Sequence, residues 1–171
     1  MEVIINNKDN LKDDQINEVV KRVKVLLVNS SNEMLLGYSH NTYQFIGGHV
    51  EDEEFEDAIV REVKEETGLE LSKNSKYTPF AILNGYYKDW PNVGVNRKTE
   101  IYYYEVQTDL LPNLSNTSYT EHEKSGDFEL RYVKVDDLLM EINHKAFVYG
   151  DEQGIAKEML ELLKIYFNNK K

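Results

Sequence analysis

The sequence contains no cysteine among its 171 residues. Without thiols the chain has no disulfide, no cysteine-ligated metal centre and no thiol nucleophile. Proline and glycine number only three and nine, which excludes a collagen-like or low-complexity chain. No apolar run approaches the roughly 18 residues of a membrane-spanning helix, and the first ten residues lack the basic and apolar regions of a signal peptide. We therefore expect a single cytoplasmic domain over residues 1–171, without membrane association.

Basic residues are outnumbered, and the acidic excess is concentrated in one segment. The chain has 31 Asp and Glu against 20 Lys and Arg, a net charge of −11. Residues 47–71 hold ten of the acidic residues and two of the basic ones, so −8 of this charge falls within 25 residues. An acidic balance without a basic stripe disfavours long nucleic acid as a partner. The segment 47–71 is therefore the first place to look for a site.

The hydrophobic pattern predicts alternating strands and helices. Residues 22–28 and 33–38 flank the turn residues 29–32 and predict a β-hairpin. The first twenty residues are ambiguous, and residues 109–127 predict a polar loop. Further strands are predicted at 43–46, 78–87, 100–108 and 128–135, and helices at 53–67, 136–142 and 153–167. This order predicts an α/β (α+β) fold with a mixed β-sheet between helices.

A helical wheel over residues 55–67 places carboxylates on the face that the apolar residues would bury. At roughly 100° per residue, Glu62 and Glu66 fall among the apolar side chains and Glu65 falls on their flank. Arg61 falls on the opposite, solvent-facing side, away from these carboxylates. The pattern predicts that at least two acidic side chains of this helix are buried.

Glu62, Glu65 and Glu66 are three and four positions apart, so their like charges repel one another on one helix face. Partial burial raises the cost of this repulsion. A bound cation would relieve both effects, and oxygen ligands without His or Cys favour Mg²⁺ or Mn²⁺ over zinc. The alternative is an ordinary acidic helix whose carboxylates pair with Lys and Arg elsewhere in the chain.

The same segment resembles the Nudix box, Gly-x5-Glu-x7-Arg-Glu-U-x-Glu-Glu-x-Gly-U, in which U is aliphatic. Every defined position is matched from Gly47 to Leu69, and a weaker similarity extends to the preceding hairpin and to residues 129–138. The resemblance implies a Nudix-like α/β/α sandwich in which the box forms a loop–helix–loop. It also implies a metal-dependent pyrophosphohydrolase, in which water attacks a nucleoside diphosphate linked to another moiety.

Residue by residue, the resemblance implies roles for the matched positions. Arg61 would be structural and would pair with Glu53, although a shortened turn leaves Glu54 open as its partner. Bound Mg²⁺ or Mn²⁺ would neutralise the pyrophosphate, and a carboxylate would accept the proton of the attacking water. The implied metal-binding and catalytic groups are Glu62, Glu65, Glu66 and the carbonyl of Gly47.

A further carboxylate is expected from outside the box, because relatives often supply a catalytic Glu from the loop before the late strand. In this chain that loop ends with Glu121 and Glu123, and we expect one of them to be catalytic. Glu100, at the start of a predicted strand, is the alternative. The simpler interpretation is that Glu121 and Glu123 only decorate a surface loop.

Three residues are candidates for contact with a small nucleotide-type diphosphate substrate. His49 follows the double glycine, and Arg97 lies in the basic run 96–98. Tyr38 stands near the position where many relatives carry an arginine. For His49 and Arg97 the alternative is an ordinary solvated surface residue. The sequence is also compatible with a homodimer.

The residue content of the chain disfavours three other functions that occur on the same fold. A Nudix-fold module that binds a nucleotide without cleaving it would not need the costly set of three glutamates. Isopentenyl diphosphate isomerase uses a catalytic cysteine, which this chain lacks. Hydrolysis at an RNA 5′ end stays open but is disfavoured by the acidic balance.

Overall fold

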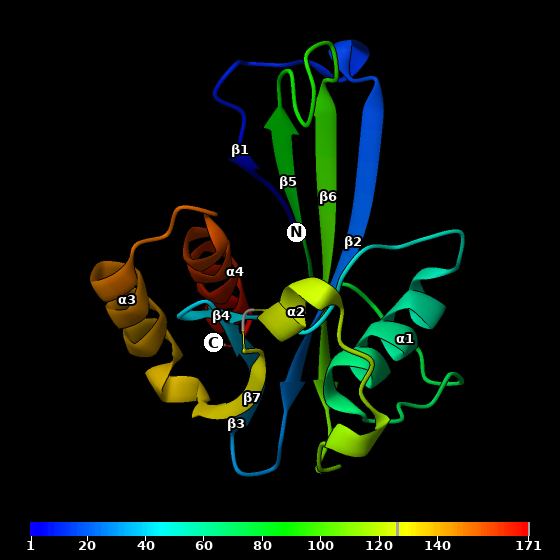
Figure 1. The fold of residues 1–171 in the computed structure, drawn as a ribbon, viewed down its shortest axis with the longest axis vertical. Coiled ribbons are helices and arrows are strands. Elements are labelled where there is room, and N and C mark those ends of the chain that lie inside the picture. The colour runs from blue at the N-terminus through cyan, green and yellow to red at the C-terminus, as the bar shows by residue number, and fades with distance from the viewer. Residues whose placement is uncertain (126, 171) are drawn as a thin grey trace.

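The computed structural model describes residues 1–125 and 127–170, without the side chains of His122 and Glu123. Figure 1 shows long central strands with α1 on one side and α3 and α4 on the other. The helices are α1 (Phe55–Thr67), α2 (Glu121–Ser125), α3 (Leu138–Tyr149) and α4 (Ile155–Asn169), with 3₁₀ turns at Asp13–Gln15, Leu114–Asn116 and Val135–Asp137. The predicted arrangement of a mixed sheet between helices is confirmed.

Within the described residues the sheet has seven strands, in the order β1-β5-β6-β2-β3-β4, and β7 pairs with β3. β1 pairs with β5 and β2 with β6 in parallel, whereas the other pairs are antiparallel. The strands are β1 (Glu2–Asn6), β2 (Glu18–Val28), β3 (Glu33–Ser39), β4 (Thr42–Gln44), β5 (Ala81–Tyr87), β6 (Arg97–Gln107) and β7 (Glu129–Lys134).

Two apolar cores lie on opposite faces of this sheet because strand side chains alternate between faces. Val23 and Val25 of β2 pack against Ile59 and other apolar residues of α1. Leu26, the residue after Val25, points to the opposite face and belongs to the core under α3 and α4, together with Leu162. The alternation of β2 therefore ties the box helix and the C-terminal helices to the same strand.

The junction that positions the site is the edge of β2. β2 pairs with β3 only at its end, where Leu27 and Val28 face Leu35 and Met34. Further upstream the same edge pairs with residues 46–50, through backbone hydrogen bonds such as Val23 N–H to the carbonyl oxygen of Gly48 at 3.0 Å. The double-glycine segment is thus held on the sheet, directly before α1.

Several predicted boundaries were wrong. β2 begins at Glu18 and β6 at Arg97, because the two strands pair in parallel along their whole lengths, including polar residues with no clear alternation. α3 continues to Tyr149, seven residues beyond its predicted end, with a largely exposed C-terminal half. The predicted loop 109–127 contains a 3₁₀ turn and the short helix α2.

No helix of the described residues is long and apolar enough to cross a membrane.

Candidate active site

Two glycines allow the backbone before α1 to approach both the sheet and the helix. Gly47 has a φ of +131°, and a Cβ there would lie 2.2 Å from the carbonyl oxygen of Val23. At Gly48 a Cβ would lie 2.5 Å from Oε1 of Glu62. A side chain at Gly47 would therefore force the segment away from β2, whereas one at Gly48 would displace the carboxylate of Glu62.

The buried face of α1 carries two carboxylates, as the helical wheel predicted. Glu62 and Glu66 are 9% and 6% exposed, whereas the side chain of Glu65 is 39% exposed. Oε1 of Glu66 accepts a hydrogen bond from the backbone N–H of Gly47 at 3.1 Å. Gly68 ends the helix in the left-handed conformation, with a φ of 71°. The helix thus points its carboxylates at the double-glycine segment.

Arg61 joins these carboxylates together, which corrects the expectation that it would point away from them. Its Nε donates to Oε1 of Glu53 at 3.1 Å, so Glu53 and not Glu54 is its partner in the preceding turn. Its Nη1 also lies 2.7 Å from Glu62 and 3.3 Å from Glu65. The wheel gives only the direction of Cβ, and the long arginine side chain reaches around the helix to the acidic side.

The charge state of the site follows from burial and from Arg61. Burial raises the pKa of Glu62, and the hydrogen bond from Arg61 opposes this shift. The same guanidinium lowers the pKa of Glu53, mainly through its hydrogen bonds. Two carboxylates on one arginine therefore differ in their response to acid, because only Glu62 is strongly desolvated.

Basic side chains of β2 lie on the other side of the site. Lys24 is 8% exposed, and its Nζ donates to the carbonyl oxygen of Phe45 at 3.0 Å. Burial, and then the charge of Arg22, lower the pKa of Lys24. His49 pairs with Arg22 through the backbone, and burial followed by the Arg22 charge lowers its pKa too. Arg22 therefore places positive charge opposite the carboxylates of α1, whereas the lowered pKa of His49 favours its neutral form.

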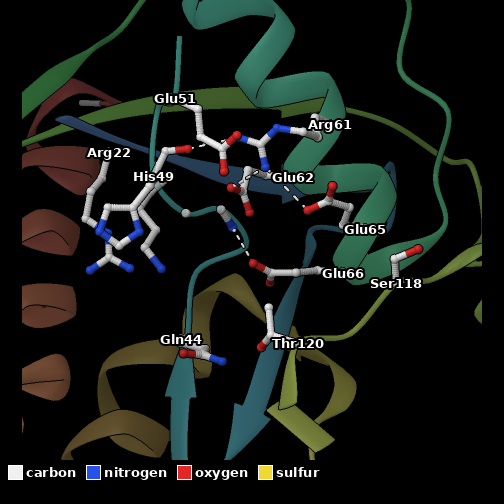
Figure 2. Close-up of a pocket in the computed structure, with 13 residues that line it drawn as sticks. Arg22, Gln44, His49, Glu51, Arg61, Glu62, Glu65, Glu66, Ser118 and Thr120 are labelled. Atoms are coloured by element: carbon white, nitrogen blue, oxygen red, sulfur yellow. Dashed lines mark hydrogen bonds and ion pairs between the residues drawn. The ribbon is translucent and has the colours of Figure 1, made fainter. Parts of the chain in front are cut away.

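Between the two sides lies a cavity of about 400 Å³. Figure 2 shows Arg22 and His49 on one side, the glutamates and Arg61 on the other, and Gln44 and Thr120 below them. The cavity is therefore lined by acidic and basic groups from β2, β4, the double-glycine segment, α1 and the segment before α2. Its lining residues are Arg22, Lys24, Gln44, Gly47, Gly48, His49, Glu51, Arg61, Glu62, Glu65, Glu66, Ser118 and Thr120.

The structure does not bring every predicted site residue to this cavity. The side chain of Glu121 is 92% exposed and forms an ion pair with Lys124 at 2.9 Å. The side chain of Glu123 lies outside the described residues. Glu100 is engaged by Lys98 at 3.0 Å and by the hydroxyl of Tyr102. None of these described carboxylates lines the cavity, although Thr120, one residue before Glu121, does.

Tyr38 and Arg97 also lie elsewhere. The ring of Tyr38 is buried, with the guanidinium of Arg131 3.4 Å from its centroid. Arg97 forms an ion pair with Glu18, its neighbour across the parallel strands. Of the three residues predicted to contact substrate, only His49 lines the cavity.

Sequence reasoning missed Arg22, Lys24, Gln44, Glu51, Ser118 and Thr120. A signal was present for Lys24, because it stands at a buried position of the apolar run RVKVLLV, where a charged residue is costly. For Gln44, Ser118 and Thr120 the sequence carries no comparable signal, since their place at the cavity depends on how distant segments meet.

The residue types fit a hard divalent cation, but the side chains do not surround one in this arrangement. Glutamate oxygens and a backbone carbonyl are the ligands that Mg²⁺ and Mn²⁺ prefer. Among the described residues, no three His, Cys, Asp or Glu side chains are grouped closely enough to hold an ion together. Arg61 is instead paired with Glu53, Glu62 and Glu65. A cation at Glu62 and Glu65 would have to displace part of this pairing.

Comparison with known proteins supports the interpretation of the segment 47–69. The family model for the NUDIX domain matches residues 17–153. Three solved structures share the fold at low sequence identity. They are the ORF135 protein of E. coli (17% identity, 94% of this chain and 96% of that one, TM-score 0.57), a MutT protein of Methanosarcina mazei (18%, 90% and 97%, 0.55) and the DR0079 protein of Deinococcus radiodurans (21%, 84% and 81%, 0.52).

Proposed function

The chain belongs to the Nudix domain family of hydrolases that act on phosphoric anhydride bonds, and on this basis we propose the reaction it catalyses. The protein hydrolyses a nucleoside diphosphate linked to another moiety, with Mg²⁺ or Mn²⁺ as cofactor. The observation that carries the proposal is the pair of buried carboxylates, Glu62 and Glu66, held against the double glycine at the cavity.

The metal-binding role falls to the buried pair. Glu62 and Glu66 are the most buried carboxylates of the cavity, and desolvation makes their negative charge costly unless a cation neutralises it. The carbonyl of Gly47 supplies a further oxygen. A divalent cation bound there would neutralise the phosphates and favour loss of a proton from water.

Glu65 is the group best placed to accept that proton. Its side chain is partly exposed at the cavity, so water reaches it, and it is less desolvated than its two neighbours. Arg61 orients Glu65 and Glu62 at the same time through one guanidinium group. The reaction needs no covalent nucleophile, because water attacks phosphorus while the phosphate charge is neutralised.

The test is product release from a panel of nucleotides and nucleotide derivatives, each with Mg²⁺, with Mn²⁺ and with excess chelator. We expect turnover with metal and none in chelator. In Glu66→Gln the rate should fall on the order of 10²–10³, equivalent to about 3–4 kcal/mol of transition-state stabilisation.

The matched control is Glu56→Gln, which removes an exposed carboxylate of the same helix outside the cavity and should keep the native rate. Full activity in chelator, or native turnover in Glu66→Gln, would contradict the proposal. Metal-dependent nucleotide binding without cleavage of any compound would favour a binding module on the same fold.

A further inference from the structure

Arg22 lines the cavity, and no carboxylate of the described residues neutralises its charge at close range. Its Nε is buried and finds no hydrogen-bond partner among the described residues. No ion pair among those residues includes Arg22 either. By contrast, Arg61 at the same cavity is paired with three glutamates. A buried N–H without a partner is uncommon and calls for a group that accepts a hydrogen bond.

The position of Arg22 makes that group a ligand in the cavity. Residues 22 and 24 are two apart on β2, so their side chains share one face of the sheet. Lys24 is the more buried of the two, and Arg22 is only partly buried while lining the same cavity. Figure 2 shows Arg22 beside His49, across the cavity from Glu62, Glu65 and Glu66.

The electrostatics on this side favour an anion. Arg22 and Lys24 both line this side of the cavity, and Lys24 donates to a backbone carbonyl oxygen rather than to a carboxylate. The glutamates on the opposite wall are engaged by Arg61 and by the backbone of Gly47. A planar guanidinium matches the geometry of two phosphate oxygens, which it can bind through paired hydrogen bonds.

We propose that Arg22 binds a second phosphate group of the substrate, one that the glutamates of α1 and their metal do not hold. This inference rests on the proposed function, because it assumes that the first phosphate lies at the glutamates. The phosphate chain then runs from α1 across the cavity to β2, and Arg22 selects substrates with at least two linked phosphates over monophosphates.

A second arginine on the same sheet face shows why Arg22 is singled out. Arg97 of β6 opposes Glu18 in the parallel register, and Arg22 opposes Ile101, so both arginines point to the side of α4. Arg97 is neutralised by Glu18, whereas Arg22 has an apolar neighbour at the equivalent position. The difference leaves the Arg22 guanidinium available to a ligand.

The test is calorimetric and compares two probes in the presence of Mg²⁺. Imidodiphosphate, whose P–N–P bridge resists hydrolysis, presents two linked phosphates, and inorganic monophosphate presents one. Arg22→Gln should bind imidodiphosphate about 10- to 100-fold more weakly than the native protein. Its affinity for monophosphate should stay within about twofold of the native value, because that probe occupies the glutamate side alone.

The charge-matched control is Lys21→Gln, which removes an exposed cation from the opposite face of the same strand. It should bind both probes as the native protein does. Thermal unfolding checks that each variant is folded. If Arg22→Gln does not fold, Arg22→Lys serves instead, since an ammonium group cannot form the paired hydrogen bonds and should still weaken imidodiphosphate binding selectively.

Equal binding of imidodiphosphate by the native protein and a folded Arg22 variant would overturn the inference. An equal loss for both probes would also overturn it, because Arg22 would then act on the whole site. Neither result would contradict the proposed function. That function is contradicted separately if the native protein cleaves no compound of the nucleotide panel with Mg²⁺ or Mn²⁺.

Discussion

Glu62 shows how burial and charge meet in a single residue of this site. Its carboxylate is nearly covered, would lie 2.5 Å from a Cβ at Gly48 and accepts a hydrogen bond from Arg61 at 2.7 Å. Desolvation outweighs this hydrogen bond, so the pKa of Glu62 is raised. A carboxylate with a raised pKa is destabilising when ionised, which is typical of a group arranged for function rather than for stability.

Without metal, the native protein should therefore have a lower free energy of unfolding than Glu62→Gln at neutral pH. The folded pKa of Glu62 lies above its ordinary value of 4.5, so its ionisation destabilises the fold once the pH exceeds the folded pKa. As the pH falls through the folded pKa toward 4.5, the native carboxylate takes up a proton and the difference shrinks. Urea unfolding in chelator across this pH range measures it, and a stability difference that grows in acid would contradict the assignment.

At the scale of elements, α1 is joined to the turn before it by one ion pair. Arg61 binds Glu53 through two of its nitrogens, at 3.1 Å and 2.5 Å, and donates to the carbonyl oxygen of His49 at 2.9 Å. These contacts hold residues 49–53 against the helix. The turn and the helix thus act as one unit, and the position of the carboxylates depends on it.

Glu53→Gln should lower the free energy of unfolding by about 1–3 kcal/mol, because it weakens a charge-assisted pair that is mostly shielded from water. Turnover should fall as well, since Arg61 also orients Glu62 and Glu65. The pair's contribution is present above the ordinary pKa of Glu53 and is lost as the pH falls through its lowered value. Glu54→Gln, the exposed neighbour, is the control and should change neither quantity. Equal effects of both variants would refute the pairing.

The segment before β7 is expected to supply a catalytic carboxylate from outside the Nudix box. Thr120 lines the cavity, and α2 starts one residue later with Glu121, which is paired with Lys124 on the surface. We still expect Glu121 or Glu123 to contribute, through closure of this short segment over a bound substrate. One of Glu121→Gln and Glu123→Gln should lose turnover at saturating metal, and Glu100→Gln should not. Native turnover in both, with a loss in Glu100→Gln, would assign the role to β6.

At the scale of the whole molecule, the site forms where two halves of the sandwich meet at β2. One face of this strand packs on α1, which supplies the glutamates, and the other carries Arg22 and Lys24 toward the side of α4. The cavity crosses the sheet edge where residues 46–50 take the place of a neighbouring strand. A ligand bound there contacts both layers at once.

Metal binding should consequently stabilise the whole fold. A cation that binds only the native state adds about 2.7 kcal/mol at a free concentration of 100 times its Kd. The unfolding temperature should rise with added Mg²⁺ or Mn²⁺ in the native protein and in Glu56→Gln. The rise should be much smaller in Glu66→Gln. An unfolding temperature that does not change up to millimolar metal would argue against a metal site in this cavity.

The sequence by itself determined the features that depend on neighbours a few positions apart. The 3.6-residue period of α1 placed Glu62 and Glu66 on the buried face, and the spacing from Gly47 to Leu69 identified the family. Turn residues between two apolar runs predicted the β2–β3 hairpin. These patterns are local, so no knowledge of the packing was needed to find them.

Only the tertiary structure decided what joins distant segments. The parallel pairing of β2 with β6 extended both strands into polar residues, and the pairing of residues 46–50 with β2 brought His49 beside Arg22. The path of the Arg61 side chain and the partner of Glu53 likewise depend on how a turn folds onto a helix. The sequence marked Lys24 and His49 singly, but only the sheet pairing shows that both lie beside Arg22 at one cavity.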